Sequence, residues 1–115
     1  MKYLLLIYGE SAEDAMEDGD QAAWDQFNRM LEDRDAWVGA EALTRASSAK
    51  TVAVRDGAPL VTDGPFAETK EQLAGYYLVD CDGWDEALEL AAQIPSAADG
   101  TAQIEVRAVL EWREP

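Results

Sequence analysis

The 115-residue sequence predicts a single domain, residues 1–115, of the α+β class. Three observations lead to this prediction: two amphipathic helical segments, long apolar runs typical of central strands, and an Asp-Gly pair that joins two short strands. If this hairpin is an insertion, the remaining elements follow the order β-α-β-β-α-β. That order is the split βαβ pattern of a ferredoxin-like sheet, with both helices on one face.

The first strand comes from residues 2–8, a continuous apolar run bounded by Gly9, as expected for a strand buried on both faces. Residues 10–20 are strongly acidic and place Ser11 and Asp14 at capping-box spacing, which predicts a mobile loop or a frayed helical turn. The acidic run lacks the ordered spacing of a calcium-binding EF-hand loop. No metal site is therefore predicted.

A helix and a second strand follow. Asp20 is placed to cap a helix that runs to about Asp33. Residues 37–43 alternate in character and predict a strand, and residues 44–50 form a polar connector. The apolar side chains of the helix are spaced three and four positions apart, which predicts a core-facing stripe: Ala23, Trp24, Phe27, Met30 and Leu31.

A hairpin is predicted over residues 51–62, because Asp56-Gly57 suits the type I′ turn that matches the twist of paired strands. Pro59 has no N–H to donate, so its strand should lie at a sheet edge. The two-residue loop fixes the register and makes one face of the hairpin apolar. The expected pairs are Arg55 with Ala58, Val54 with Pro59, and Val52 with Val61.

A structural corner is predicted at residues 63–66. Asp63 can accept hydrogen bonds from nearby backbone N–H groups, and Gly64 permits an unusual φ. Pro65 fixes its own φ and restricts the residue before it. Phe66 is then expected to act as an apolar anchor after the corner.

The second half of the domain starts after a short polar segment that can form a helical turn. Residues 74–79 are aromatic and β-branched on both faces, which favours a central strand. Asp82 is expected to cap a second helix, with Asp85 at its third position, and Pro95 to end it. The predicted buried stripe of this helix is Trp84, Ala87, Leu88 and Ala91. Residues 104–112 predict the last strand, whose polar face carries Glu105, Arg107 and Glu111.

The charge composition restricts the classes of molecule that this protein is expected to bind. The chain has 24 acidic and nine basic residues and a net charge of −15, which opposes binding to nucleic acid or to an anionic membrane. The same charge favours a basic protein partner.

Cys81 is the single cysteine and the opening apolar run is too short for a signal peptide, so a cytoplasmic location is expected. No histidine is present, which excludes Ser-His-Asp and Cys-His chemistry, and no cofactor motif is found.

Residues 63–80 resemble the signature of the DGPF proteins, a branch of the YCII-related family. The resemblance implies a ferredoxin-like domain that pairs into a dimeric α/β barrel, in a branch without a well-established activity. The YCII-related proteins proper are associated with a His and Asp pair proposed as catalytic, and no residue here matches the histidine. Further stretches that carry the resemblance are residues 1–10, 52–66, 86–97 and 104–112.

Assembly is expected because two helices cover one face of a sheet and leave the other face open. The apolar side chains assigned to the open face are Leu5, Tyr8, Tyr76 and Leu78. A homodimer formed through this face is the economical way to bury them, and it agrees with what the resemblance implies.

The candidate ligand-binding residues are Asp63, Lys70, Tyr76 and Arg107. A carboxylate beside Lys or Arg can bind a small polar ligand, and Arg107 on the polar face of the last strand suits an anionic group in a dimer cleft. Three functions remain open: a ligand-binding homodimer, a regulatory interaction module, and an enzyme using carboxylates and Tyr76 for proton transfer. For the second, the resemblance suggests a link to an alternative sigma factor. The alternative to all three functions is that the candidate residues have only a structural role, in a turn and in surface ion pairs.

Overall fold

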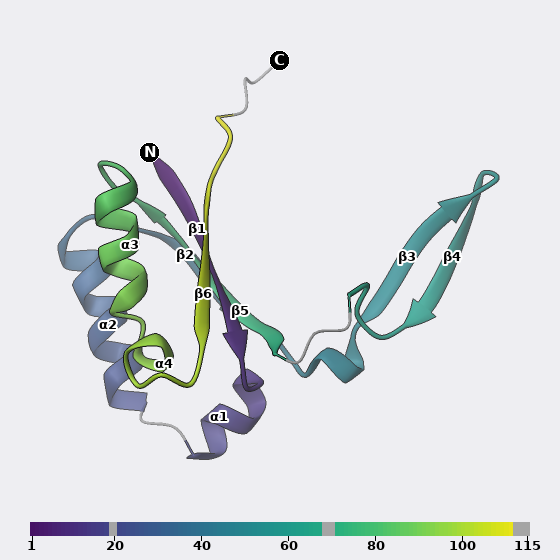
Figure 1. The fold of residues 1–115 in the computed structure, drawn as a ribbon, viewed down its shortest axis with the longest axis horizontal. Helices are drawn as coiled ribbons and strands as arrows, with labels where there is room; N and C mark the ends of the chain where they lie inside the picture. The colour runs from purple at the N-terminus through teal and green to yellow at the C-terminus, as the bar shows by residue number, and fades with distance from the viewer. Residues whose placement is uncertain (19–20, 68–70, 112–115) are drawn as a thin grey trace.

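The computed structural model, which describes residues 1–18, 21–67 and 71–111, contains a four-stranded antiparallel sheet and a separate two-stranded sheet (Figure 1). The strands of the larger sheet are β1 (Lys2–Gly9), β2 (Trp37–Ala42), β5 (Gln72–Asp80) and β6 (Gln103–Ala108). Their order, β2-β5-β1-β6, places β1 and β5 in the centre, as predicted. The α+β class is thereby confirmed, and the topology is compatible with a ferredoxin-like fold.

The described residues form the helices α1 (Ala12–Asp18), α2 (Gln21–Asp33), α3 (Trp84–Ala92) and α4 (Pro95–Ala98). Helices α2 and α3 cover one face of the larger sheet, and α1 lies beyond the end of β1 (Figure 1). Figure 1 shows α2 and α3 side by side on the same side of the sheet. The acidic segment contains α1, where the Asp14 N–H donates to Ser11 Oγ at 3.1 Å, and the proposed cap Asp20 lies outside the described residues. No helix among the described residues has the length and apolarity needed to cross a membrane.

The core lies between the sheet and the two long helices. Alternate residues of β1 are buried against them, and Leu5 is fully buried opposite Tyr77 of β5. The assignment of Leu5 to the open face is therefore wrong, because the alternation of β1 directs its odd-numbered residues towards the helices. The helices contribute Phe27, Leu31, Leu90 and Ile94 to this core.

Helix α3 differs from its prediction at both ends and in its stripe. Gly83 is its N-cap residue, and the Asp82 N–H donates to Glu86 Oε2 at 3.0 Å instead of Asp82 capping the helix. The helix ends at Ala92, and Pro95 begins α4, a position where the missing N–H of proline costs nothing. The buried stripe consists of Ala87, Leu90 and Ala91, whereas Trp84 and Leu88 are exposed.

The hairpin consists of β3 (Lys50–Arg55) and β4 (Ala58–Asp63), and all three predicted pairs of its register are confirmed. Both turn residues have positive φ, 50° at Asp56 and 78° at Gly57, which is the type I′ geometry. We call residues 50–63 the arm. The arm stands apart from the larger sheet, on the side opposite to α2 and α3 (Figure 1).

The corner after the arm contains a glycine in the left-handed region. Gly64 has φ 97°, its N–H donates to the Ala49 carbonyl at 2.7 Å, and its own carbonyl accepts from Thr51 Oγ1 at 2.8 Å. The Asp63 carboxylate accepts a hydrogen bond from Lys50 Nζ at 2.7 Å, and not from the backbone as predicted. The expected anchor role of Phe66 is also wrong within one chain, because its side chain is 92% exposed.

Gly64→Val is expected to lower the free energy of unfolding by about 1 to 3 kcal/mol, because a β-branched residue is strained at this φ. Ala58→Val is the control in the same arm, since it adds a β-branched side chain at an exposed residue of β4 without positive φ, on the face of the arm opposite to Val52. Urea denaturation of both variants at one protein concentration measures the difference. A change at Gly64 below about 0.5 kcal/mol would show that the corner is not strained.

Candidate functional site

The sheet face opposite α2 and α3 brings two of the predicted site residues together. Tyr76 of β5 pairs with Leu6 of β1, and Leu6 pairs in turn with Glu105 of β6. Arg107 pairs with Leu4, one row further along the same face. Tyr76 and Arg107 therefore lie on one face, two strands and two residues apart, which puts their Cα atoms about 12 Å from each other. Both side chains are long enough to reach one small ligand between them.

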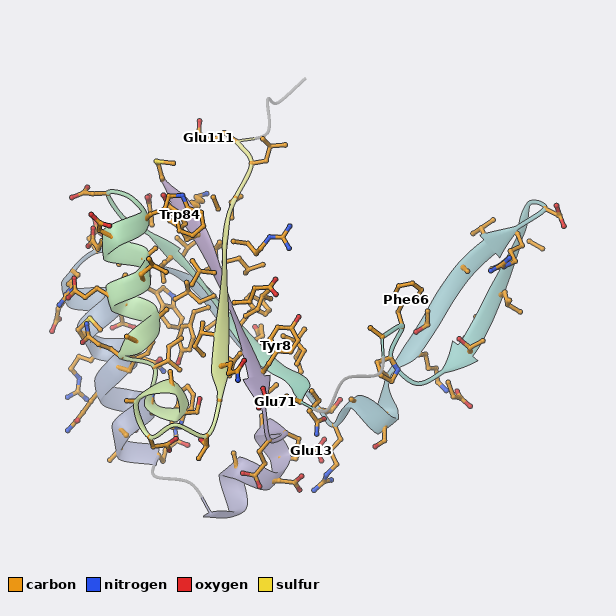
Figure 2. All side chains as sticks on the ribbon, viewed as in Figure 1. Tyr8, Glu13, Phe66, Glu71, Trp84 and Glu111 are labelled. Carbon is orange, nitrogen blue, oxygen red and sulfur yellow. The ribbon has the colours of Figure 1, made fainter. Side chains whose placement is uncertain are left out.

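Alternation along the two central strands produces this face. In β1 the even-numbered residues Leu4, Leu6 and Tyr8 point away from the helices and are half-buried. Tyr76 and Leu78 are their counterparts in β5. We call these five residues, with Glu105 and Arg107, the open face. Figure 2 shows Tyr8 on the side of the sheet that faces the arm.

Arg107 is a cation of β6 on this face, and Lys2 lies at the edge of the same side, at the start of β1. Its side chain is 70% exposed, and its Nη1 makes one long contact with Glu105 Oε2, at 3.4 Å. A guanidinium has five N–H donors, so a single contact of this length leaves most of its hydrogen-bonding capacity for another acceptor. Arg107 thus keeps the geometry that an anion-binding residue needs.

Two hydroxyl groups on the open face were not recognised as a pair from the sequence. Within the described part of the chain, neither the Tyr8 nor the Tyr76 hydroxyl has a hydrogen-bond partner. Tyr8 was assigned to this face only as an apolar residue. Tyr8 lies two residues after Leu6 and therefore points to the same face of β1. Because Leu6 pairs with Tyr76, this spacing indicates a second phenol on the face of Tyr76.

The remaining predicted site residues are elsewhere. Asp63 is at the end of β4, in the arm, where Lys50 neutralises it. The structure therefore does not bring Asp63 onto the open face with Tyr76 and Arg107. Lys70 lies outside the residues that the structure describes.

Tyr77 and Cys81 are buried and serve the core. The Tyr77 hydroxyl donates to Asn28 Oδ1 at 2.6 Å, and burial raises the pKa of this phenol to about 12. Burial also raises the pKa of the Cys81 thiol, which keeps it in the unreactive thiol form. Adjacent residues Tyr76 and Tyr77 thus have different surroundings, because neighbours in a strand face opposite sides.

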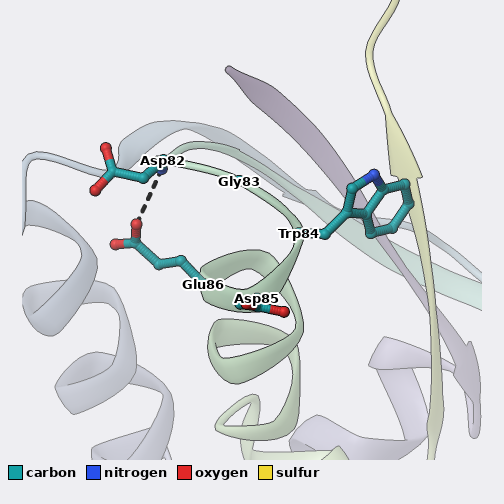
Figure 3. A pocket seen from close by; sticks show the side chains of 5 residues that line it. All are labelled: Asp82, Gly83, Trp84, Asp85 and Glu86. Carbon is teal, nitrogen blue, oxygen red and sulfur yellow. Dashed lines mark hydrogen bonds between the residues drawn. The ribbon is translucent and has the colours of Figure 1, made fainter.

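A hollow of about 390 Å³ lies at the start of α3, lined by Asp82, Gly83, Trp84, Asp85 and Glu86 (Figure 3). Figure 3 shows the Trp84 ring directed away from the carboxylates of Asp82 and Glu86. The described lining residues carry three carboxylates and no cation, so they repel an anionic ligand. The indole of Trp84 instead contacts the ring of Tyr3, with centroids 5.1 Å apart.

A second, larger groove of about 810 Å³ runs along α2 and the segment from Gln93 to Thr101. Its wall includes Trp24, Phe27 and Met30, which the helical spacing assigned to the core. Phe27 is buried, and Trp24 and Met30 are half-buried and pack against the core. None of the described residues that line this groove is a lysine or an arginine.

Comparison with known proteins agrees with the resemblance seen in the sequence. An uncharacterized protein of Rhizobium meliloti (strain 1021) is 48% identical to this chain over 65 residues, which are 56% of this chain and 52% of that protein. The chain therefore spans about half the length of that relative. The family model of the YCII-related domain matches residues 1–113. This coverage shows that the chain belongs to the YCII-related family.

Proposed function

We propose that this protein is a homodimer that binds a small anionic ligand between the open faces of its two subunits, as in a dimeric α/β barrel. The observation that carries the proposal is the position of Arg107. It is a cation with one long contact, placed on a face whose other residues are leucines, tyrosines and Glu105.

A second copy is the natural cover for the open face. Leu4, Leu6 and Leu78 form a continuous apolar patch across β5 and β1 that the helices do not reach. Patches of this kind on a soluble protein mark an interaction site. Under twofold symmetry the same patch meets itself, so one surface supplies both halves of the interface.

Covering the open face changes what Arg107 requires. A guanidinium removed from water needs acceptors for its N–H groups, and the single contact with Glu105 leaves most of them unmet. A carboxylate, phosphate or phenolate held by the Arg107 fork supplies these acceptors. The hydroxyls of Tyr8 and Tyr76 add donors and their rings add walls, a combination typical of small-ligand sites.

The test is binding of a defined anion panel: benzoate, succinate and inorganic phosphate. At least one of them should raise the melting temperature of the wild-type protein, because binding to the folded state alone stabilises it. Arg107→Met should weaken that anion by roughly 10-fold or more while the dimer persists, since hydrogen bonds to a charged group each contribute about 1.5 to 3 kcal/mol. Isothermal calorimetry gives the dissociation constants.

Arg29→Met is the matched control, because Arg29 is an exposed arginine of α2, on the opposite side of the sheet. It should leave anion affinity unchanged. The proposal fails if none of the three anions binds, or if Arg107→Met and Arg29→Met bind as well as the wild type. Capture of a basic protein without any anion binding would favour the interaction module instead.

A further inference from the structure

We infer that the arm packs against a second copy of this chain and extends the contact made by the open faces. The inference rests on the homodimer of the proposed function but does not depend on the ligand. It gives the arm, which neither the helices nor the larger sheet covers, a role in contacting a second subunit.

The arm exposes an apolar surface that is unusual for a hairpin in water. Val52, Val54 and Val61 are 62%, 70% and 56% exposed, and their register places them with Pro59 on one face. Phe66 stands at the base of the arm with almost all of its surface exposed (Figure 2). An isolated two-stranded hairpin is only marginally stable in water, so this surface requires a cover.

The base of the arm is firmly attached to its own domain. The Arg45 N–H and its Nη1 both donate to the Glu13 carboxylate at 2.8 Å, and the Ala46 N–H donates to Gln72 Oε1 at 2.7 Å. At the other end, the Gly64 N–H donates to the Ala49 carbonyl. The first three bonds anchor the segment that precedes the arm, and the last one closes the base of the arm itself. A preorganised element loses less entropy when a partner binds.

The direction of the arm matches the position that a second copy would take. The molecule is flat, with extents of 48 × 44 × 18 Å, and Figure 1 views it down the short axis. In that view the arm and the open face are on the same side of the sheet, opposite to the helices. A partner sheet placed on the open face would lie beside the arm.

The arm enlarges the surface that a second copy can cover. Four strands about 4.8 Å apart, each about six residues long at roughly 3.4 Å per residue, give the open side of the sheet a flat footprint of about 400 Å². One face of the arm adds about 200 Å² of footprint by the same geometry, and the area covered by the partner's arm adds about as much again. The two arms therefore about double the footprint of the contact.

Charge favours a second copy over an unrelated basic protein. The arm contains Lys50 and Arg55 against Asp56 and Asp63 and is neutral, whereas the rest of the chain carries seven basic and 22 acidic residues. Two such acidic bodies repel each other, and the neutral apolar arm is the part that approaches an acidic surface without that cost. A basic protein would be drawn to the acidic body instead.

The test replaces the arm valines by threonine, which keeps their shape and strand preference. The triple variant Val52→Thr, Val54→Thr and Val61→Thr should raise the dimer dissociation constant by 10-fold or more in sedimentation equilibrium. Leu60→Thr is the matched control, because Leu60 pairs with Ala53 on the opposite face of the arm. Its dissociation constant should change by less than 3-fold.

A second measurement uses the wild-type chain, so it does not depend on how a variant folds. In a mixed sample of ¹³C-labelled and unlabelled chains, the methyl groups of Val52, Val54 and Val61 should show intermolecular nuclear Overhauser effects. Their absence, with an unchanged dissociation constant for the triple variant, overturns the arm contact. If the wild type still dimerises and binds an anion, the proposed function survives that result. An arm-dependent dimer that binds none of the three anions would overturn the ligand proposal alone.

Discussion

Leu6→Glu is expected to convert the dimer into a monomer at micromolar concentration. Leu6 lies in the middle of the open face, between Tyr76 and Glu105. In a symmetric dimer the substitution places two carboxylates in an apolar interface, beside Glu105 of each subunit. Leaving a buried charge unpaired costs about 3 to 5 kcal/mol, so the dissociation constant should rise by at least about 100-fold.

The measurement for Leu6→Glu is sedimentation equilibrium across a range of concentrations. The control is Leu88→Glu, which adds the same charge at an exposed leucine of α3, on the helix side. It should remain dimeric. A Leu6→Glu variant that dimerises like the wild type would contradict the assignment of the interface to the open face. A monomeric wild type would contradict the homodimer itself.

Leu90→Ala is expected to lower the free energy of unfolding by about 2 to 5 kcal/mol, whereas Leu88→Ala should change it by less than about 0.5 kcal/mol. The two leucines are two residues apart in α3, but Leu90 is 0% exposed and Leu88 is 52% exposed. Truncating Leu90 removes buried apolar contacts and leaves a cavity. Truncating Leu88 removes mostly solvated surface.

Urea denaturation of both variants at equal concentration gives the two free energies. The pair is a direct check on the side of α3 that faces the sheet, because helix propensity is nearly the same at both positions. Equal losses at Leu88 and Leu90 would mean that another surface covers Leu88, as a partner subunit on the helix side would do.

Local chemistry explains why several elements were predicted correctly. Asp56-Gly57 specifies its own turn, and a two-residue turn leaves one register for β3 and β4. The φ of 97° at Gly64 agrees with the expectation that a glycine at this corner permits an unusual φ. Tyr76 and Arg107 were assigned to the polar or open side of their strands, and cross-strand pairing confirms that they share one face.

The errors concern contacts between distant segments. The continuous apolar run of β1 has no alternation in polarity, so nothing in it tells Leu5 from Leu4 until the helices select a face. The predicted stripe of α3 includes Leu88 because this residue lies four positions after Trp84 and three before Ala91, spacings that also fit one face of a helix. Asp63 was grouped with Arg107 by charge alone, although the arm carries it away from the sheet.

The sequence by itself determined the order of the elements, the turn of the arm, the acidic surface and the exclusion of histidine chemistry, because each depends on composition or on residues close in the chain. Only the tertiary structure decided which leucines are buried, where Arg107 and Tyr76 lie relative to each other, and that the arm stands free with Val54 and Phe66 exposed. The physical reason is that burial is a property of two surfaces in contact. One segment shows that it has an apolar side, and the packing of the whole chain determines what covers it.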